Sequence, residues 1–285
     1  GIELSIESQN IVRPNFHWTT TLTMSHNDQM VDDIGSEDFI SAYDSPGNNS
    51  YMMYGYVKGY PLNSLWGFKY GGTWKNADER KENEITKTYV SVSNTDGGAR
   101  YYDVNHDGVM SREDLIYQGN ADPYLYGGLQ NTFYIHGFKL GVYFAYSLGG
   151  KIYNYSEIYM AGSQFANQYR YMLDAWHPVR NPNSDIPRAG AKSDAALPSD
   201  FMIHDASYLR LKNVTLAYTF DLRKKCSWLR DLTLSVSGEN LYLWKKYNGF
   251  DPDVSTSSSN SALRRVDIGA YPKPRTIIFS LQIRY

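Results

Sequence analysis

Residues 126–147 read YGGLQNTFYIHGFKLGVYFAYS, and this stretch decides the fold class. A period of two in side-chain polarity predicts a β-strand with one apolar face, and residues 138–147 follow it without exception. Their apolar face holds Phe138, Leu140, Val142, Phe144 and Tyr146, and the other face holds Lys139, Gly141, Tyr143, Ala145 and Ser147. The run 126–135 is a weaker strand, with Leu129, Phe133 and Ile135 on its apolar face. Only His136-Gly137 separates the two runs, so we expect a tight turn between them.

Five further segments alternate in the same way, and together with the first two they predict seven strands. They are residues 2–7, 16–25, 213–220, 231–237 and 277–285. Their apolar faces include Ile2, Leu4 and Ile6, then Phe16, Trp18, Thr20, Leu22 and Met24, then Val214, Leu216, Tyr218 and Phe220, then Leu232, Leu234 and Val236, and finally Ile277, Phe279, Leu281, Ile283 and Tyr285. The predicted fold class is therefore all-β.

The faces opposite these apolar residues carry mostly Ser, Thr, Asn and Gly. A soluble sandwich usually presents Lys and Glu to bulk water, whereas small polar groups opposite large apolar ones fit a wide, water-filled barrel in lipid. Two alternatives stay open: a secreted, calcium-stapled β-sandwich that binds glycans, and a passive porin-like barrel.

The connections between the strands alternate between short and long. Short links lie near 9–15, at 136–137 and at 222–230, and long links span 27–125, 149–207 and 245–273. Outer-membrane barrels have short periplasmic turns and long extracellular loops. We therefore expect the three long links to be extracellular loops.

The long links carry local patterns of their own. Residues 51–75, rich in Tyr, Trp and Gly, are expected to form extra strands, and residues 164–176 a short helix with Phe165, Tyr169, Met172 and Leu173 on one face. Residues 177–200 are interpreted as irregular loop, and 255–261 as a low-complexity stretch.

Composition excludes several classes of protein. The 285 residues carry a net charge of −2, which argues against a nucleic-acid binder. A single cysteine, Cys226, excludes an intrachain disulfide framework. No run reaches 18 apolar residues, so no transmembrane helix is expected. Tyrosine is in excess, with 26 residues, and its amphipathic ring suits membrane and ligand interfaces.

One motif predicts a metal site. Calcium loops place oxygen ligands at positions 1, 3, 5, 7, 9 and 12, with Gly at position 6. The stretch 103–114 matches this spacing with Asp103, Asn105, Asp107, the Val109 carbonyl, Ser111 and Asp114, and with Gly108 at the turn. The shorter Asp at position 12 could weaken calcium or admit magnesium. Flanking helices are not evident, so we expect a structural Ca²⁺ or Mg²⁺, with a metal-free Asx-rich turn as the alternative.

No catalytic signature is evident, and the chain is not expected to be an enzyme. The six histidines form no HxH or HxxxH pair, and neither a GxSxG elbow nor a P-loop occurs. The paired acids Asp251 and Asp253 are interpreted as solvated loop charges or a local turn.

Several segments, taken together and in order, resemble the C-terminal part of the SusC/RagA family of TonB-dependent outer-membrane transporters of Bacteroidetes. They are GIELSIES, NFHWTTTLTMSHN, GYPLNSLWGFKYGGTW, YYDVNHDGVMSREDLIYQGNADPYLYGGLQNTFYIHGFKLGVYFAYSLGGKIYN, HDASYLRLKNVTLAYTF, SVSGENLYLWKKYNGFDPDV and IGAYPKPRTIIFSLQIRY. Members of the family have a plug, a TonB box and a 22-stranded barrel. The resemblance implies that residues 1–285 supply about the last seven strands of such a barrel, without the plug and the first strands.

The resemblance also implies a function and partners. A SusD-like surface lipoprotein is expected to cap the barrel and capture an oligosaccharide or peptide, and the TonB complex to supply energy through the plug. The expected location is the outer membrane of a Gram-negative, Bacteroidetes-like cell. The residues that touch the substrate are unknown at this stage. Seven strands cannot close a barrel, so both edge strands would need partners in lipid.

Overall fold

The computed structural model describes residues 1–44, 52–160, 167–190, 197–223, 228–254 and 265–285. Its helices are α1 (Ala77–Thr86) and α2 (Ser156–Met160), with short 3-10 turns η1 (Arg112–Asp114) and η2 (Arg170–Asp174). Its strands are β1 (Ile2–Arg13), β2 (Phe16–His26), β3 (Phe39–Asp44), β4 (Met52–Val57), β5 (Ser64–Gly67), β6 (Tyr70–Thr73), β7 (Tyr89–Val90), β8 (Ala99–Tyr102), β9 (Ile116–Asn120), β10 (Leu125–Ile135), β11 (Phe138–Leu148), β12 (Lys151–Asn154), β13 (Ile203–Asp205), β14 (Tyr208–Asp221), β15 (Asp231–Lys245), β16 (Val266–Asp267) and β17 (Thr276–Arg284).

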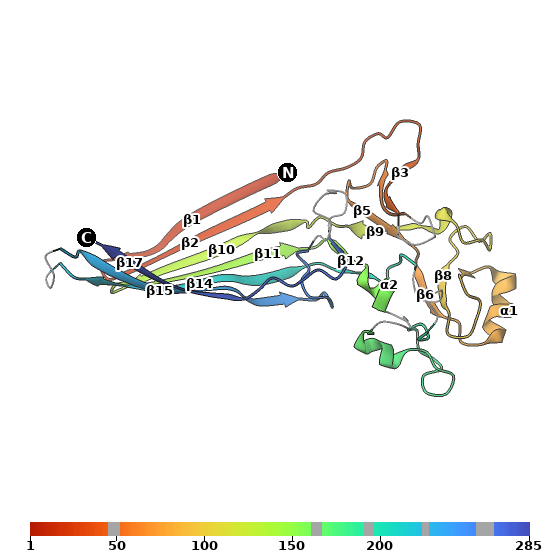
Figure 1. Ribbon diagram of the computed structural model, residues 1–285. Helices are drawn as coiled ribbons and strands as arrows, with labels where there is room; N and C mark the ends of the chain where they lie inside the picture. The colour runs from red at the N-terminus through yellow and green to blue at the C-terminus, as the bar shows by residue number, and fades with distance from the viewer. Residues whose placement is uncertain (45–51, 161–166, 191–196, 224–227, 255–264) are drawn as a thin grey trace.

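The seven predicted strands form one antiparallel sheet in the order β1-β2-β10-β11-β14-β15-β17. The prediction of seven strands is confirmed, and because they lie in a single sheet the sandwich alternative is wrong. Three strands are several residues longer than predicted: β1 continues to Arg13, β14 begins at Tyr208 and passes through an irregularity near Leu211, and β15 continues to Lys245. In Figure 1 the hairpin turns lie at one end of this sheet and the three long links at the other.

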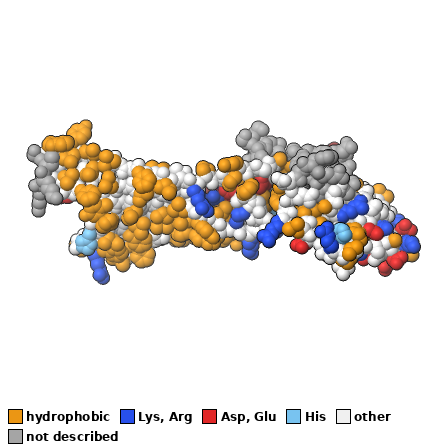
Figure 2. Space-filling model, turned by 60° about the horizontal axis from the view of Figure 1, so that its bottom comes forward, with side chains coloured by type: hydrophobic (Ala, Val, Ile, Leu, Met, Phe, Trp, Pro, Cys, Tyr) orange, Lys and Arg blue, Asp and Glu red, His pale blue; other side chains and the backbone are white. Residues whose placement is uncertain are grey.

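The two faces of the sheet differ in polarity. We call the face with the apolar strand positions the outer face and the opposite, more polar face the inner face. On the outer face Phe133 lies opposite both Trp18 and Leu140, and the ring centroids of Trp18 and Phe133 are 5.6 Å apart in a stacked pair. Hydrophobic side chains cover the sheet on the face shown in Figure 2, whereas charged side chains gather at the loop end. This apolar wall is exposed: Phe279 and Ile277 on the edge strand β17 are 82% and 65% exposed.

The few polar groups on the outer face bond to one another. Thr20 Oγ1 donates to Asn131 Oδ1 at 2.7 Å, and Trp18 Nε1 donates to the same oxygen at 3.0 Å. Asn10 Nδ2 in turn donates to Thr20 Oγ1 at 2.6 Å. Polar side chains that hydrogen-bond to one another do not need water as a partner, so contact with hydrocarbon costs them little free energy. Thr20 can therefore stand on an otherwise apolar wall.

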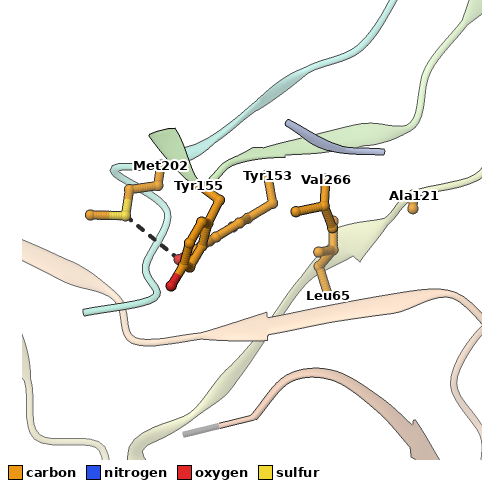
Figure 3. Close-up of a cluster of buried hydrophobic side chains, with 6 residues drawn as sticks. All are labelled: Leu65, Ala121, Tyr153, Tyr155, Met202 and Val266. Atoms are coloured by element: carbon orange, nitrogen blue, oxygen red, sulfur yellow. Dashed lines mark hydrogen bonds between the residues drawn. The ribbon is translucent and has the colours of Figure 1, made fainter. Parts of the chain in front are cut away.

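The three long links fold into one lobe at the end of the sheet. A buried core joins Leu65 and Ala121 of the first link, Tyr153, Tyr155 and Met202 of the second, and Val266 of the third. Figure 3 shows these side chains converging, with the Tyr153 hydroxyl 3.6 Å from Met202 Sδ. The lobe contains three small sheets: β3-β4-β5-β9, β6-β8-β7 and β13-β12-β16. Residues of the β6-β8-β7 sheet pack in a second cluster that includes Phe68, Val90 and Tyr101. The extra strands expected within 51–75 are present as β4, β5 and β6.

The helices of the lobe differ from the sequence prediction. Of the helix expected over 164–176, the described part, 167–176, forms the 3-10 turn η2, and Phe165 lies outside the described residues. Met172 is buried but Leu173 is 77% exposed, so the two do not share a face as expected. Helix α1 was not predicted from the sequence; Asn76 caps it by accepting from the N–H groups of Asp78 and Glu79. Among the described residues, no helix is long and apolar enough to cross a bilayer.

Candidate functional site

A large cavity lies where the inner face of the sheet meets the lobe. Its volume is about 1010 Å³. Its lining includes Thr23, Ser25, Asn63, Asp122, Tyr126, Tyr143, Tyr208, Asp253 and Arg265. The tyrosine rings offer flat apolar surfaces beside hydroxyl, amide and charged groups, a combination that suits a sugar ring or a peptide backbone.

The sheet register explains why these residues meet. Strands side by side place equivalent positions in rows, and one row across the inner face runs Ser25, Tyr126, Ser147, Tyr208, Lys245. These five residues come from five different strands. A second cavity of about 670 Å³ lies farther along the inner face, toward the hairpin turns, and its lining includes His17, Lys139 and Gln282. The inner face is therefore hollow toward both ends and lined largely by polar groups.

Arg265 joins the third link to the rim of the sheet. Its Nη2 donates to Ser147 Oγ at 2.8 Å and its Nη1 to the Gly149 carbonyl at 3.2 Å. Ser147 is the inner-face residue near the end of β11, and Arg265 directly precedes β16. The guanidinium therefore places positive charge at the wall of the large cavity while it holds the lobe to the sheet.

A buried ion pair lies beside the same cavity. Arg210 Nη2 lies 2.7 Å from Asp251 Oδ1, and the two side chains are only 5% and 2% exposed. Asp253 lies 3.9 Å from the same guanidinium nitrogen and also pairs with Lys273. Asp251 is therefore not a solvated loop charge, because its partner stands 41 positions away on β14. The alternative of a local turn agrees with the structure, since the Asp253 N–H donates to Asp251 Oδ1 at 3.0 Å.

Two further polar pairs are buried inside the lobe. The Tyr247 hydroxyl donates to Asp267 Oδ2 at 2.7 Å, and His204 Nε2 lies 3.2 Å from Glu157 Oε2. Burial, together with the hydrogen bond to Asp267 and its negative charge, raises the pKa of Tyr247 above its usual value. Each pair connects two distant parts of one long link, Tyr247 and Asp267 within the third and His204 and Glu157 within the second.

The predicted metal loop lies between β8 and β9, at the part of the lobe that also carries α1 (Figure 1). Asp103 is 2% exposed and Asp114 is fully buried. The Gly108 N–H donates to Asp103 Oδ2 at 2.7 Å, and Asp114 accepts from the N–H groups of Val104 and Ser111, both at 2.9 Å.

The other predicted ligands form a tight polar turn. Asn105 Oδ1 accepts from the Asp107 N–H at 3.2 Å, and Asp107 Oδ1 accepts from the Val109 N–H at 2.6 Å. Ser111 Oγ accepts from the Glu113 N–H at 3.1 Å. The absence of flanking helices is as expected, since β8 precedes the loop and only η1 follows. Within the described ranges, no group of three His, Cys, Asp or Glu side chains is already gathered as a metal centre.

Comparison with known proteins gives a consistent relationship. No family model matches the sequence. Along all of its length the chain is 31% identical to TonB-dependent receptor P26 of Formosa agariphila, of which it covers 29%. It is likewise 25% identical to the TonB-dependent receptor SusC of Bacteroides thetaiotaomicron, of which it covers 26%. The chain thus spans between a quarter and a third of the length of these curated relatives.

Solved structures share the fold. A structure described as the RagAB peptide transporter matches 99% of this chain and 28% of that one, with a TM-score of 0.74 and 20% sequence identity. A RagAB peptide importer in an open-open state gives a TM-score of 0.73. The similarity to TonB-dependent receptors indicates an outer-membrane location. The exposed apolar face of the sheet and its hollow, polar inner face agree with that location. The chain is therefore a SusC/RagA-like portion of an outer-membrane TonB-dependent receptor barrel.

Proposed function

We propose that this chain forms part of the wall and the extracellular lobe of a barrel that imports an oligosaccharide or a peptide across the outer membrane. The cavity of about 1010 Å³ carries the proposal, because it opens between the polar inner wall and the lobe. A nutrient leaving the lobe would meet tyrosine rings and hydrogen-bonding groups before it entered the lumen. The chain supplies no chemistry in this proposal and acts by binding and guiding.

In this proposal the links 27–125, 149–207 and 245–273 are extracellular loops, and the hairpin turns are periplasmic. The shared core of Leu65, Tyr153 and Val266 supports the assignment, because all three links then lie on one side of the membrane. Strands β1 and β17 are the edges of the seven-stranded sheet. Their remaining backbone groups would pair with the other strands of a closed barrel, as lipid demands.

A SusD-like surface lipoprotein is the proposed partner of the lobe, and the TonB complex the proposed energy source. The names of the relatives support TonB coupling, and the RagAB structures support an assembly of this kind. The lobe also exposes large apolar side chains, among them Leu173 at 77%, Val179 at 82% and Tyr271 at 90%. Exposed apolar groups of this kind are typical of surfaces that a partner covers.

The topology is tested by labelling single cysteines with a membrane-impermeant maleimide on whole cells. The background is the full receptor with Cys226→Ser. Ile85→Cys, 85% exposed on α1, should react on intact cells. Trp228→Cys, 70% exposed in the link between β14 and β15, should react only after lysis. The reverse pattern would contradict the assignment of the lobe to the outside.

Transport is tested in a strain that depends on the receptor for growth on its substrate. Loss of the partner lipoprotein or of TonB should reduce uptake to the level of a receptor deletion. Unchanged uptake without TonB would favour the passive porin-like alternative. Unchanged uptake without the lipoprotein alone would remove the lid assignment and leave the importer in place.

A further inference from the structure

One carboxylate oxygen in the lobe has no partner. Asp103 is 2% exposed, its Oδ2 accepts from the Gly108 N–H at 2.7 Å, and its Oδ1 is buried without any hydrogen bond. The bond from Gly108 ties the carboxylate to the turn that residues 103–108 form, and the unbonded Oδ1 belongs to the same carboxylate. A buried, ionised carboxylate without a full set of partners is costly, and natural proteins compensate it with a donor or a cation.

Among the described residues, no Lys, Arg or His side chain forms an ion pair with Asp103. None of the ion pairs formed among the described residues uses Asp103, Asp107 or Asp114. Lys87 approaches the loop, but its Nζ donates to the Asp107 carbonyl at 2.8 Å and not to a carboxylate. Three aspartates thus lie within twelve residues of sequence, and they accept from backbone N–H groups and, at Asp107, also from Asn105 Nδ2 at 3.0 Å. Their mutual repulsion is unfavourable unless a cation joins them.

The oxygens needed for a cation are present in the order that oxygen-rich loops use. A carboxylate oxygen has two lone-pair sites, so an oxygen that accepts one N–H can still face a metal ion. The backbone takes the left-handed conformation at His106 (φ 59°) and Gly108 (φ 81°), which curls the loop around its own centre. Calcium accepts six to eight oxygens in flexible geometry, so a calcium loop does not require one rigid arrangement of its side chains.

We propose that the loop Asp103–Asp114 binds one hard divalent cation, with Asp103 Oδ1 as the preformed ligand. Asp107, Asp114, Asn105, Ser111 and the Val109 carbonyl would complete the set. The short carboxylate at Asp114 makes the site tolerant of magnesium as well as calcium.

The cation would fix the outer part of the lobe. The loop leaves β8 of the β6-β8-β7 sheet and enters β9 of the β3-β4-β5-β9 sheet. The Asp103 N–H donates to the Thr88 carbonyl at 3.0 Å, and His106 Nδ1 lies 3.0 Å from the Lys87 carbonyl at the C-cap of α1. A cation held by both ends of the loop therefore ties two sheets and one helix together. This inference is independent of the transported substrate.

The test uses the full receptor in detergent, stripped with a chelator and titrated with CaCl₂ by calorimetry, with terbium luminescence as a second readout. Tyr102 directly precedes Asp103 and would sensitise a bound terbium ion. We expect the parent protein to show a site whose affinity falls by about tenfold or more in Asp103→Asn and in Asp107→Asn. Calcium should also raise the melting temperature of the parent protein and not that of Asp103→Asn.

The matched control is Glu82→Gln, which removes one exposed negative charge from neighbouring α1 and should leave the titration unchanged. Asp107 is exposed, so Asp107→Asn keeps the test valid if Asp103→Asn does not fold. Equal binding by the parent and both loop variants would overturn the proposal. The absence of any calcium heat, terbium signal or melting shift in the parent would overturn it as well, and would leave a metal-free Asx-rich turn.

Discussion

Arg210 Nη2 and Asp251 Oδ1 are 2.7 Å apart in the interior, and this contact joins the sheet to the lobe. Arg210 lies on the inner face of β14, and Asp251 follows the end of β15. The guanidinium also lies 5.3 Å from the ring centre of Tyr208, which lines the large cavity. The ion pair therefore fixes the position of the first residues of the third link and of one part of the wall of the large cavity.

Removing one member of this pair should destabilise the lobe strongly. Asp251→Asn leaves the buried guanidinium with only the more distant carboxylate of Asp253 at 3.9 Å, and breaking a buried pair costs about 3–5 kcal/mol in comparable cases. Thermal unfolding of the receptor in detergent measures the loss. The exposed pair Arg223–Asp221 is the control, because Arg223→Ala should leave the melting temperature unchanged. Identical melting of Asp251→Asn and the parent would show that the pair does not hold the lobe.

The lobe core should respond to truncation in the same assay. Leu65 is fully buried among side chains from all three links, so Leu65→Ala should cost about 2–5 kcal/mol through lost burial and a cavity. Leu62 is only three positions away but 38% exposed, and Leu62→Ala should cost much less. If the two variants melted alike, the three links would not share one core.

Sequence patterns predicted the wall better than the lobe, for a physical reason. Strand alternation is local, so Phe138–Ser147 and its six counterparts could be recognised one by one. The partner of Arg210 stands 41 positions away, and the cavity residues Tyr126 and Tyr208 meet only through the sheet register. Such contacts depend on tertiary pairing, which no local spacing reports. The Asp103–Asp114 loop could be recognised because all of its oxygens lie within twelve residues.

The hydrogen bond from Tyr247 to Asp267 should contribute measurably to stability. Asp267 is 4% exposed, and its Oδ2 accepts from the Tyr247 hydroxyl at 2.7 Å. Tyr247→Phe removes the donor and leaves the ring in place, so a loss of about 1–3 kcal/mol is expected. Tyr271→Phe is the control, since Tyr271 is 90% exposed. A variant Tyr247→Phe as stable as the parent would mean that water replaces the hydroxyl at no cost.

Alkaline pH should weaken the lobe partly through Tyr247. Burial and Asp267 raise its pKa above the ordinary value of 10.0, so folding favours the neutral phenol. That contribution is fully present below the unfolded pKa and is lost as the pH rises through the folded one. Melting temperatures should therefore fall less steeply above about pH 10 in Tyr247→Phe than in the parent. Parallel slopes would contradict this role.

The central claim is that the apolar face of the seven-stranded sheet meets lipid and the polar face meets water. Phe279 and Ser280 test it most directly, because they are neighbours on β17 at one depth and point to opposite faces. Nitroxide labels at Phe279→Cys and Ser280→Cys, in the Cys226→Ser receptor reconstituted in bilayers, report accessibility to oxygen and to a polar nickel chelate. We expect oxygen to relax the label at 279 more strongly than the label at 280, and the nickel chelate to relax the label at 280 more strongly than the label at 279. Equal accessibility at both positions, or the reverse order, would contradict it.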